Sequence, residues 1–254
     1  LFRALTGLII TTALILALRQ PALFRTRRPG MQLVRHGFHF FGQCGWLFGI
    51  GYLTLADVFA LEFTVPVWVA LIAALFLRER LTAARCVAIV MGVIGVVIIV
   101  NPTTGLFDDA AFVVLGAAVF YAIAHTANKS LAHTETALGL IFYMSLIQLP
   151  IGIVLSAHAW ITPEGFQWIW LISIGICALV GHYCLTRAMQ LADVSFVMTV
   201  DFLRLPLVAI IGVLLYLEPL KVSLLVGGVV ILVSNMINVR DQLDRTLHQG
   251  RETR

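Results

Sequence analysis

Long apolar stretches alternate with short polar segments along the whole chain. Each stretch runs for about 18 to 24 residues, and an α-helix needs about 20 residues to cross a bilayer. A membrane β-strand would need only about 10 residues and would alternate polar and apolar positions, which these stretches do not do. The pattern predicts nine membrane-spanning helices, near residues 2–19, 36–53, 57–77, 83–100, 111–129, 138–156, 166–187, 194–217 and 221–239.

The composition agrees with this pattern. Hydrophobic residues make up 60% of the chain and charged residues 12%, whereas soluble domains carry about 25% charged residues. Most of the chain therefore lies where charge is costly, and in lipid only helices or closed barrels satisfy every backbone polar group. The sequence predicts an all-α membrane protein, folded as a polytopic helical bundle.

The basic residues are divided unequally between the two ends of the predicted helices. Fourteen of the 17 lysines and arginines fall in alternate loops or in the C-terminal tail, while Arg3 and Lys221 lie on the other side and Arg204 lies inside a span. Loops rich in Lys and Arg stay in the cytoplasm, so the tail is predicted to be cytoplasmic. This topology accounts for the net charge of +4, and no nucleic-acid partner is needed.

The tetrapeptide Leu-Ala-Asp-Val occurs twice, at residues 55–58 and 191–194, and each copy opens an apolar stretch that contains a proline, Pro66 or Pro206. The copies open the third and the eighth predicted spans. Because five spans separate them, the same motif enters the membrane from opposite faces. Inverted repeats of this kind are typical of transporters, and we predict two inverted five-helix repeats.

The repeats are predicted at residues 1–101 and 108–239, followed by the cytoplasmic tail at 240–254. The second repeat shows five helices and the first only four. The chain also begins without Met, inside an apolar run. We expect one helix to be missing ahead of Leu1, so that the complete bundle has ten.

A glutamate-leucine turn follows each proline-containing stretch, with Glu79 and Glu218 lying 13 and 12 residues after their prolines. Together with the pair Phe2-Arg3 near the start, these features resemble the drug/metabolite transporter superfamily, EamA type. The resemblance implies ten helices around a central cavity, export or uptake of small metabolites, and a location in a bacterial inner membrane. Pro219, beside Glu218, departs from the turn usual in that family.

Three ionisable residues lie well inside predicted spans: Glu62, Asp201 and Arg204. Each costs about 2.5 to 3.5 kcal/mol on insertion scales, so a functional role is expected. Glu62 and Arg204 lie beside the two prolines, which kink helices and leave a polar cavity where helices of the two repeats cross. Asp201 and Arg204 are three residues apart and can form an ion pair on one helix face. Arg204 is therefore expected either to bind substrate or to be neutralised in a pair that holds helices together.

Other polar and aromatic side chains on several spans are candidates to line the same cavity: Gln43, Trp46, Tyr121, His125, Asn128 and His182. Three of them, at positions 121, 125 and 128, share one helical face. Cavity lining and polar contact between helices both remain open for this stripe. The pair His36 and His39 is interpreted as lying at the membrane interface.

Signatures of enzymes and cofactor sites are absent from the sequence. The four cysteines form no CxxC pair, and there is no HExxH, P-loop, GxSxG or dinucleotide fingerprint. We therefore predict no metal, no cofactor and no enzymatic activity.

The leading hypothesis is a secondary transporter that moves a small polar or amphipathic metabolite through the lipid bilayer by rocking one repeat against the other. If protons are coupled to transport, Glu62 or Asp201 is the expected carrier, with His125 or His182 next. An arginine among aromatic side chains suits a substrate with a carboxylate or a ring, such as an amino acid, a flavin or a nucleoside-like molecule.

The alternatives are a channel or a structural membrane protein and, with less support, a membrane-embedded enzyme, because the charged residues are few and scattered. Direction of transport stays open, as does the choice between a monomer and a homodimer. The close glycines, Gly45 with Gly49 and Gly92 with Gly95, are expected to pack helices within the bundle.

Overall fold

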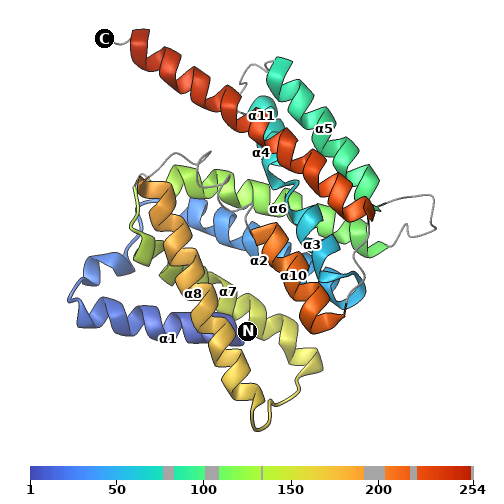
Figure 1. Ribbon diagram of the computed structural model, residues 1–254. Coiled ribbons are helices and arrows are strands. Elements are labelled where there is room, and N and C mark those ends of the chain that lie inside the picture. Colours follow the sequence, from blue (N-terminus) through green and yellow to red (C-terminus); the bar gives the residue numbers. More distant parts are fainter. Residues whose placement is uncertain (77–82, 101–108, 133, 192–203, 218–221, 253–254) are drawn as a thin grey trace. The chain divides into compact units, whose positions relative to one another are not determined.

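A computed structural model of the chain describes residues 1–76, 83–100, 109–132, 134–191, 204–217 and 222–252 (Figure 1). The described residues form helices joined by turns and contain no strand, which confirms the predicted all-α class. The α-helices are α1 (Phe2–Ala17), α2 (Pro29–Tyr52), α3 (Leu55–Glu62), α4 (Val65–Phe76), α5 (Ala83–Val100), α6 (Asp109–Ala132), α7 (Ala137–Ser156), α8 (Gln167–Leu191), α10 (Arg204–Tyr216) and α11 (Val222–Glu252), with short 3-10 helices η1 (Pro21–Phe24) and η3 (Ala157–Ala159).

Most helix boundaries lie within a few residues of the predicted ones. One exception is α11, which continues to Glu252, thirteen residues past the predicted end at residue 239. The other exception is α2. It begins at Pro29, seven residues before the predicted start at residue 36. The prediction placed the start where the apolar run begins. Proline favours the first position of a helix, so the helix also includes residues 29–35.

The third predicted span, 57–77, is two helices rather than one kinked helix. α3 ends at Glu62, and α4 begins at Val65, so that Pro66 is the second residue of α4. Proline lacks an amide hydrogen, and its ring clashes with the carbonyl one turn earlier. The Thr64 hydroxyl lies in the break, where it donates to the Leu61 carbonyl at 2.7 Å and accepts from Trp68 Nε1 at 3.0 Å.

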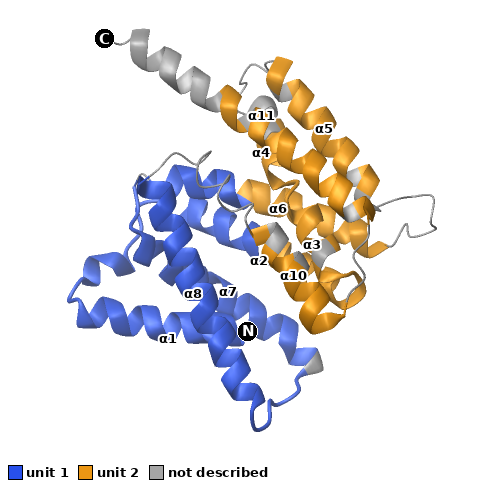
Figure 2. Ribbon diagram, in the orientation of Figure 1, with its two compact units in different colours: residues 1–40, 124–193 blue, residues 41–123, 194–254 orange. Residues whose placement is uncertain are grey.

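The chain divides into two compact units (Figure 2). Unit 1 holds residues 1–40 and 124–193, and unit 2 holds residues 41–123 and 194–254. Each unit combines segments from both predicted repeats. The helices α2 and α6 are continuous and contribute residues to both units.

In unit 1, α1 packs against α7 and α8. Small residues permit this close approach. A Cβ atom added at Gly7 would lie 2.5 Å from Ser145 Oγ, and one added at Gly175 would lie 2.7 Å from Thr6 Cβ.

In unit 2, α11 lies along α5, and glycine again sets the spacing. A Cβ atom added at Gly95 would lie 2.6 Å from Ile231 Cγ1 and 3.0 Å from the Gly227 carbonyl oxygen. An apolar cluster joins α3 to α10 and α11 through Phe59, Phe63, Val208 and Ile231. These glycines pack helices within the unit, as expected for membrane helices.

Large apolar side chains remain exposed on many helices. Ile9 is 61% exposed, Trp170 70% and Leu214 70%. Soluble monomers rarely expose such continuous apolar surface, whereas lipid covers it at no cost. Three of the described helices, α6, α7 and α8, are long and apolar enough to cross a membrane by length and composition.

We predict that Gly95→Ala lowers the thermal stability of the purified protein by the equivalent of about 1 to 3 kcal/mol, because the added methyl group meets backbone atoms of α11. The melting temperature in detergent, determined by size-exclusion chromatography of samples heated to increasing temperatures, measures this effect. Gly181→Ala is the matched control, since a Cβ atom there has nothing within 4 Å. Equal melting temperatures for the two variants would contradict the close packing of α5 and α11.

Candidate functional site

An ion pair joins α3 to α10 inside unit 2. Arg204 Nη2 donates to Glu62 Oε1 at 3.1 Å, and the two side chains are 41% and 17% exposed. Glu62 is the last residue of α3, directly before the break made by Pro66. A carboxylate at this end of a helix faces the negative end of the helix dipole, and the guanidinium offsets that unfavourable interaction.

Aromatic rings complete the surroundings of the arginine. The guanidinium carbon of Arg204 lies 5.1 Å from the centroid of the Phe59 ring and 5.5 Å from that of Phe63. Trp46 packs edge-on against Phe59, with ring centroids 5.3 Å apart. Cation–π contacts contribute about 0.5 to 2 kcal/mol each, so the guanidinium is held by one carboxylate and two ring faces.

This arrangement differs in one respect from the predicted one. Asp201 lies outside the described residues, and the described partner of Arg204 is Glu62. The two charges predicted beside the two prolines are therefore brought together directly.

The other candidate residues divide between the units. Trp46, Tyr121 and Gln43 belong to unit 2, where Tyr121 packs beside Trp68 on Val65, Ala118 and Ala122. Gln43 is half-buried on α2. His125, Asn128 and His182 belong to unit 1. The stripe of Tyr121, His125 and Asn128 lies on the unbroken helix α6, which contributes to both units.

Asn128 is buried, and its Nδ2 atom donates to the sulfur of Met189 on α8 at 3.4 Å. This contact ties α6 to α8 within unit 1.

A polar network that the sequence analysis missed lies in unit 1. Gln148 on α7 is at its centre: Oε1 accepts from Arg3 Nη2, and Nε2 donates to the His36 carbonyl at 3.2 Å and to His39 Nδ1 at 3.1 Å. Arg3 Nη1 also lies 3.4 Å from His182 Nε2. The rings of His39 and His182 meet edge to face, with centroids 5.0 Å apart. Four helices therefore supply side chains to one network.

The structure places His36 and His39, interpreted from the sequence as interfacial residues, among buried side chains. Their side chains are 0% and 7% exposed. Because α2 begins at Pro29, both residues lie about two turns or more inside the helix. Gln32, His36 and His39 follow one another at spacings of four and three, so they share one helical face. The same criterion that singled out the α6 stripe would have found them.

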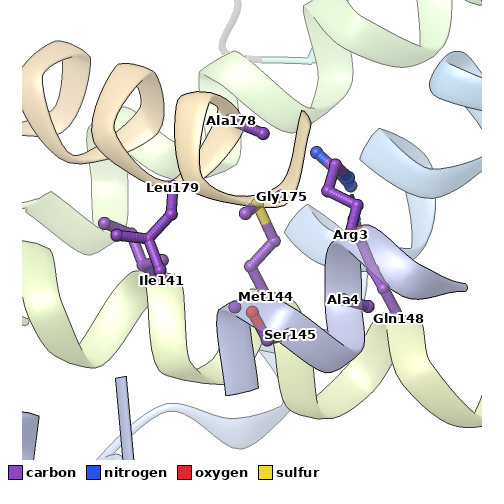
Figure 3. Close-up of a pocket in the computed structure, with 10 residues that line it drawn as sticks. Arg3, Ala4, Ile141, Met144, Ser145, Gln148, Gly175, Ala178 and Leu179 are labelled. Atoms are coloured by element: carbon purple, nitrogen blue, oxygen red, sulfur yellow. Dashed lines mark hydrogen bonds between the residues drawn. The ribbon is translucent and has the colours of Figure 1, made fainter. Parts of the chain in front are cut away.

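A small cavity lies beside Arg3 and Gln148, between α1, α7 and α8 (Figure 3). Its walls include Gly7, Ser145 and Gly175, and it has room for about one water molecule. Among the described residues, no group of three or more His, Cys, Asp or Glu side chains is placed to hold a metal ion.

Apolar helices that carry a charged pair and a polar network are the features of a polytopic membrane protein. Residues 1–101 and 109–240 match the EamA-like transporter family, and this chain belongs to that family. The predicted resemblance is thereby confirmed, and membership makes the chain a multi-pass membrane transporter rather than an enzyme.

Named relatives come from several bacteria. The chain is 26% identical over 208 residues to an S-adenosylmethionine uptake transporter of Rickettsia felis, covering 82% of this chain and 71% of the relative. It is 30% identical over 194 residues to a riboflavin transporter of Vibrio cholerae, covering 76% and 65%. It is 29% identical over 229 residues to a pseudopaline exporter of Pseudomonas aeruginosa, covering 89% and 81%.

A solved crystal structure has the same fold, with a TM-score of 0.65 and 19% identity, over 97% of this chain and 88% of that one. At this level of identity the match shows the fold alone.

The pair of Glu62 and Arg204 predicts non-additive stability effects. We expect Glu62→Gln and Arg204→Gln each to lower the melting temperature, because each leaves one charge without its counter-charge. The double variant should lose less than the sum, with a coupling of about 0.5 to 3 kcal/mol. Melting curves of the four proteins measure this, and Arg187→Gln, at an exposed arginine, is the control expected to change little. Strict additivity would show that the contact contributes nothing.

Proposed function

We propose that this chain is a secondary transporter of a small organic metabolite with an amino-acid-like, zwitterionic group or a planar ring. The observation that carries the proposal is the pair of Glu62 and Arg204 between the rings of Phe59 and Phe63. The relatives named for S-adenosylmethionine, riboflavin and pseudopaline support a small metabolite as substrate.

The chemistry of the pair favours this substrate class. A guanidinium presents a planar fork of donors that fits a carboxylate with two hydrogen bonds, and it stacks on rings. A zwitterion inserted between the two side chains would give its carboxylate to Arg204 and its cationic group to Glu62. No charge would then be left unpaired in a medium where an unpaired charge is costly. A planar ring would instead replace a phenylalanine face.

We further propose that transport proceeds by alternating access between two inverted repeats, 1–101 and 108–239. The two copies of Leu-Ala-Asp-Val and the two ranges matched by the family, 1–101 and 109–240, support this division. Glu62 and Arg204 come from different repeats, so rocking one repeat against the other would separate or reunite them. The proposed location is a bacterial inner membrane with the C-terminus in the cytoplasm, as the distribution of arginines predicts.

Counterflow separates a carrier from the alternative of a channel. We expect proteoliposomes loaded with unlabelled riboflavin or S-adenosylmethionine to take up the labelled compound faster than empty ones, because a carrier exchanges substrate across the membrane. A channel gives no such stimulation. Uptake that is the same in loaded and empty vesicles would reject alternating access.

Arg204→Ala tests the site itself. We expect uptake of the transported probe to fall by about tenfold to a hundredfold, the loss expected for one charge-assisted hydrogen bond. Size-exclusion profiles establish that the variant still inserts and folds. Arg187→Ala removes an exposed arginine of α8 and should transport as the wild type does. Wild-type uptake by Arg204→Ala would remove this residue from the site.

A further inference from the structure

The polar network of unit 1 has no part in the substrate site proposed above. It holds His36 and His39, both buried on α2, and His182, half-buried on α8, in a chain of which only 12% of the residues are charged. Arg3 on α1 and Gln148 on α7 connect them. Polar groups placed inside membrane helices are costly and are usually functional.

The orientation of the Gln148 amide is fixed by its neighbours. Arginine can only donate hydrogen bonds, so the atom that faces Arg3 must be the amide oxygen. A backbone carbonyl can only accept, so the atom 3.2 Å from the His36 carbonyl must be the amide nitrogen. The two constraints agree.

This orientation determines the protonation of the two histidines in ring contact. The amide nitrogen of Gln148 donates to His39 Nδ1, so that ring atom carries no proton. Arg3 likewise donates to His182 Nε2, so that atom carries no proton either. A histidine with one accepting nitrogen is neutral. His39 is therefore protonated on Nε2 only and His182 on Nδ1 only. Both imidazole rings are thus neutral, and the proposed site holds no extra proton.

A proton could not be added without rearranging the network. If His39 Nδ1 were protonated, it would need an acceptor, which the Gln148 amide supplies only by turning its oxygen toward His39. The amide nitrogen would then face Arg3, donor against donor, so the bond to Arg3 would have to break. Binding of one proton is thus linked to loss of the hydrogen bond between Arg3 of α1 and Gln148 of α7.

The surroundings limit the site to a single proton. The groups whose charges act on His39 are His182, Arg3, Arg35 and His125, from α8, α1, α2 and α6, and all of them are cationic or can become so. His36 lies on the same face of α2, and the neutral Gln148 faces it from α7. With ring centroids 5.0 Å apart, His39 and His182 cannot both be charged at low cost.

We propose that His39 and His182 form a binding site for one proton, opened and closed by Gln148 and Arg3, and that this proton is the coupling ion of transport. The proton comes from water and returns to water, and no bond other than hydrogen bonds and N–H changes. The cavity beside Arg3 and Gln148 gives a water molecule a place at the site (Figure 3). The coupling part of this proposal rests on the proposed transport function, and the proton site itself does not.

The proton site is tested first without any substrate. Histidine labelled with ¹⁵N in the full chain, held in lipid nanodiscs, reports the tautomer of each ring by NMR. We expect the Nε2–H form for His39, the Nδ1–H form for His182, and one shared protonation step as the pH falls. His39→Asn and His182→Gln assign the signals, because each keeps an acceptor in place of the ring nitrogen and cannot be protonated.

The Gln148→Leu variant should release His39 from the Nε2–H form. Two histidines that titrate independently of each other would overturn the proposal.

The coupling is tested by accumulation. A gradient of one pH unit across proteoliposomes should drive a concentration ratio of about tenfold for riboflavin or S-adenosylmethionine if one proton moves per substrate. The His39→Asn variant should not build up this concentration ratio. Counterflow at equal pH on both sides shows whether the variant still exchanges substrate. His158→Asn is the matched control and should accumulate as the wild type does.

Undiminished accumulation by His39→Asn would reject the coupling role. If neither probe is transported by the wild type, it is the choice of substrate class that fails, and the NMR titration still decides the proton site.

Discussion

The cost of placing charge inside a membrane bundle is the constraint on which the rest of this structure depends. A charged side chain at the centre of a span costs about 2.5 to 3.5 kcal/mol on insertion scales, so each one needs a partner. Arg204 meets a carboxylate and two aromatic faces in unit 2. Arg3 meets a neutral amide and a neutral imidazole in unit 1. The two arrangements differ in what we propose that they bind: a charged ligand in unit 2 and a proton in unit 1.

The proline break between α3 and α4 makes the first solution possible. Irregular backbone is tolerated at membrane depth only where other groups satisfy it. Here the Phe63 carbonyl accepts from Asn235 Nδ2 of α11 at 3.3 Å, and the Thr64 hydroxyl bonds the Leu61 carbonyl. Because Pro66 ends α3 at Glu62, the carboxylate lies at a helix end with Phe63 directly after it. One backbone feature thus places the charge and one of the rings that surround its partner.

Hydropathy and the internal repeat were sufficient to predict the helical class, most boundaries and the family, because these depend on residues near one another in sequence. Glu62 and Arg204 could be singled out since a charge stands out in an apolar run. Their pairing could not, because sequence spacing made Asp201 the nearer candidate and did not tell which helices touch. The burial of His36 and His39 was not predicted for another reason: hydropathy finds where an apolar run begins, whereas Pro29 sets where the helix begins.

The helix α2 carries residues of both polar sites. His39 belongs to the network of unit 1, and Trp46, seven residues later, packs on the Phe59 ring that lies under Arg204. Residues seven apart share one face of a helix, and a helix transmits a shift or rotation along its length because its backbone hydrogen bonds keep it rigid. Coupling between ion and substrate needs an element with two arrangements that both sites bias, and α2 has a side chain in each site.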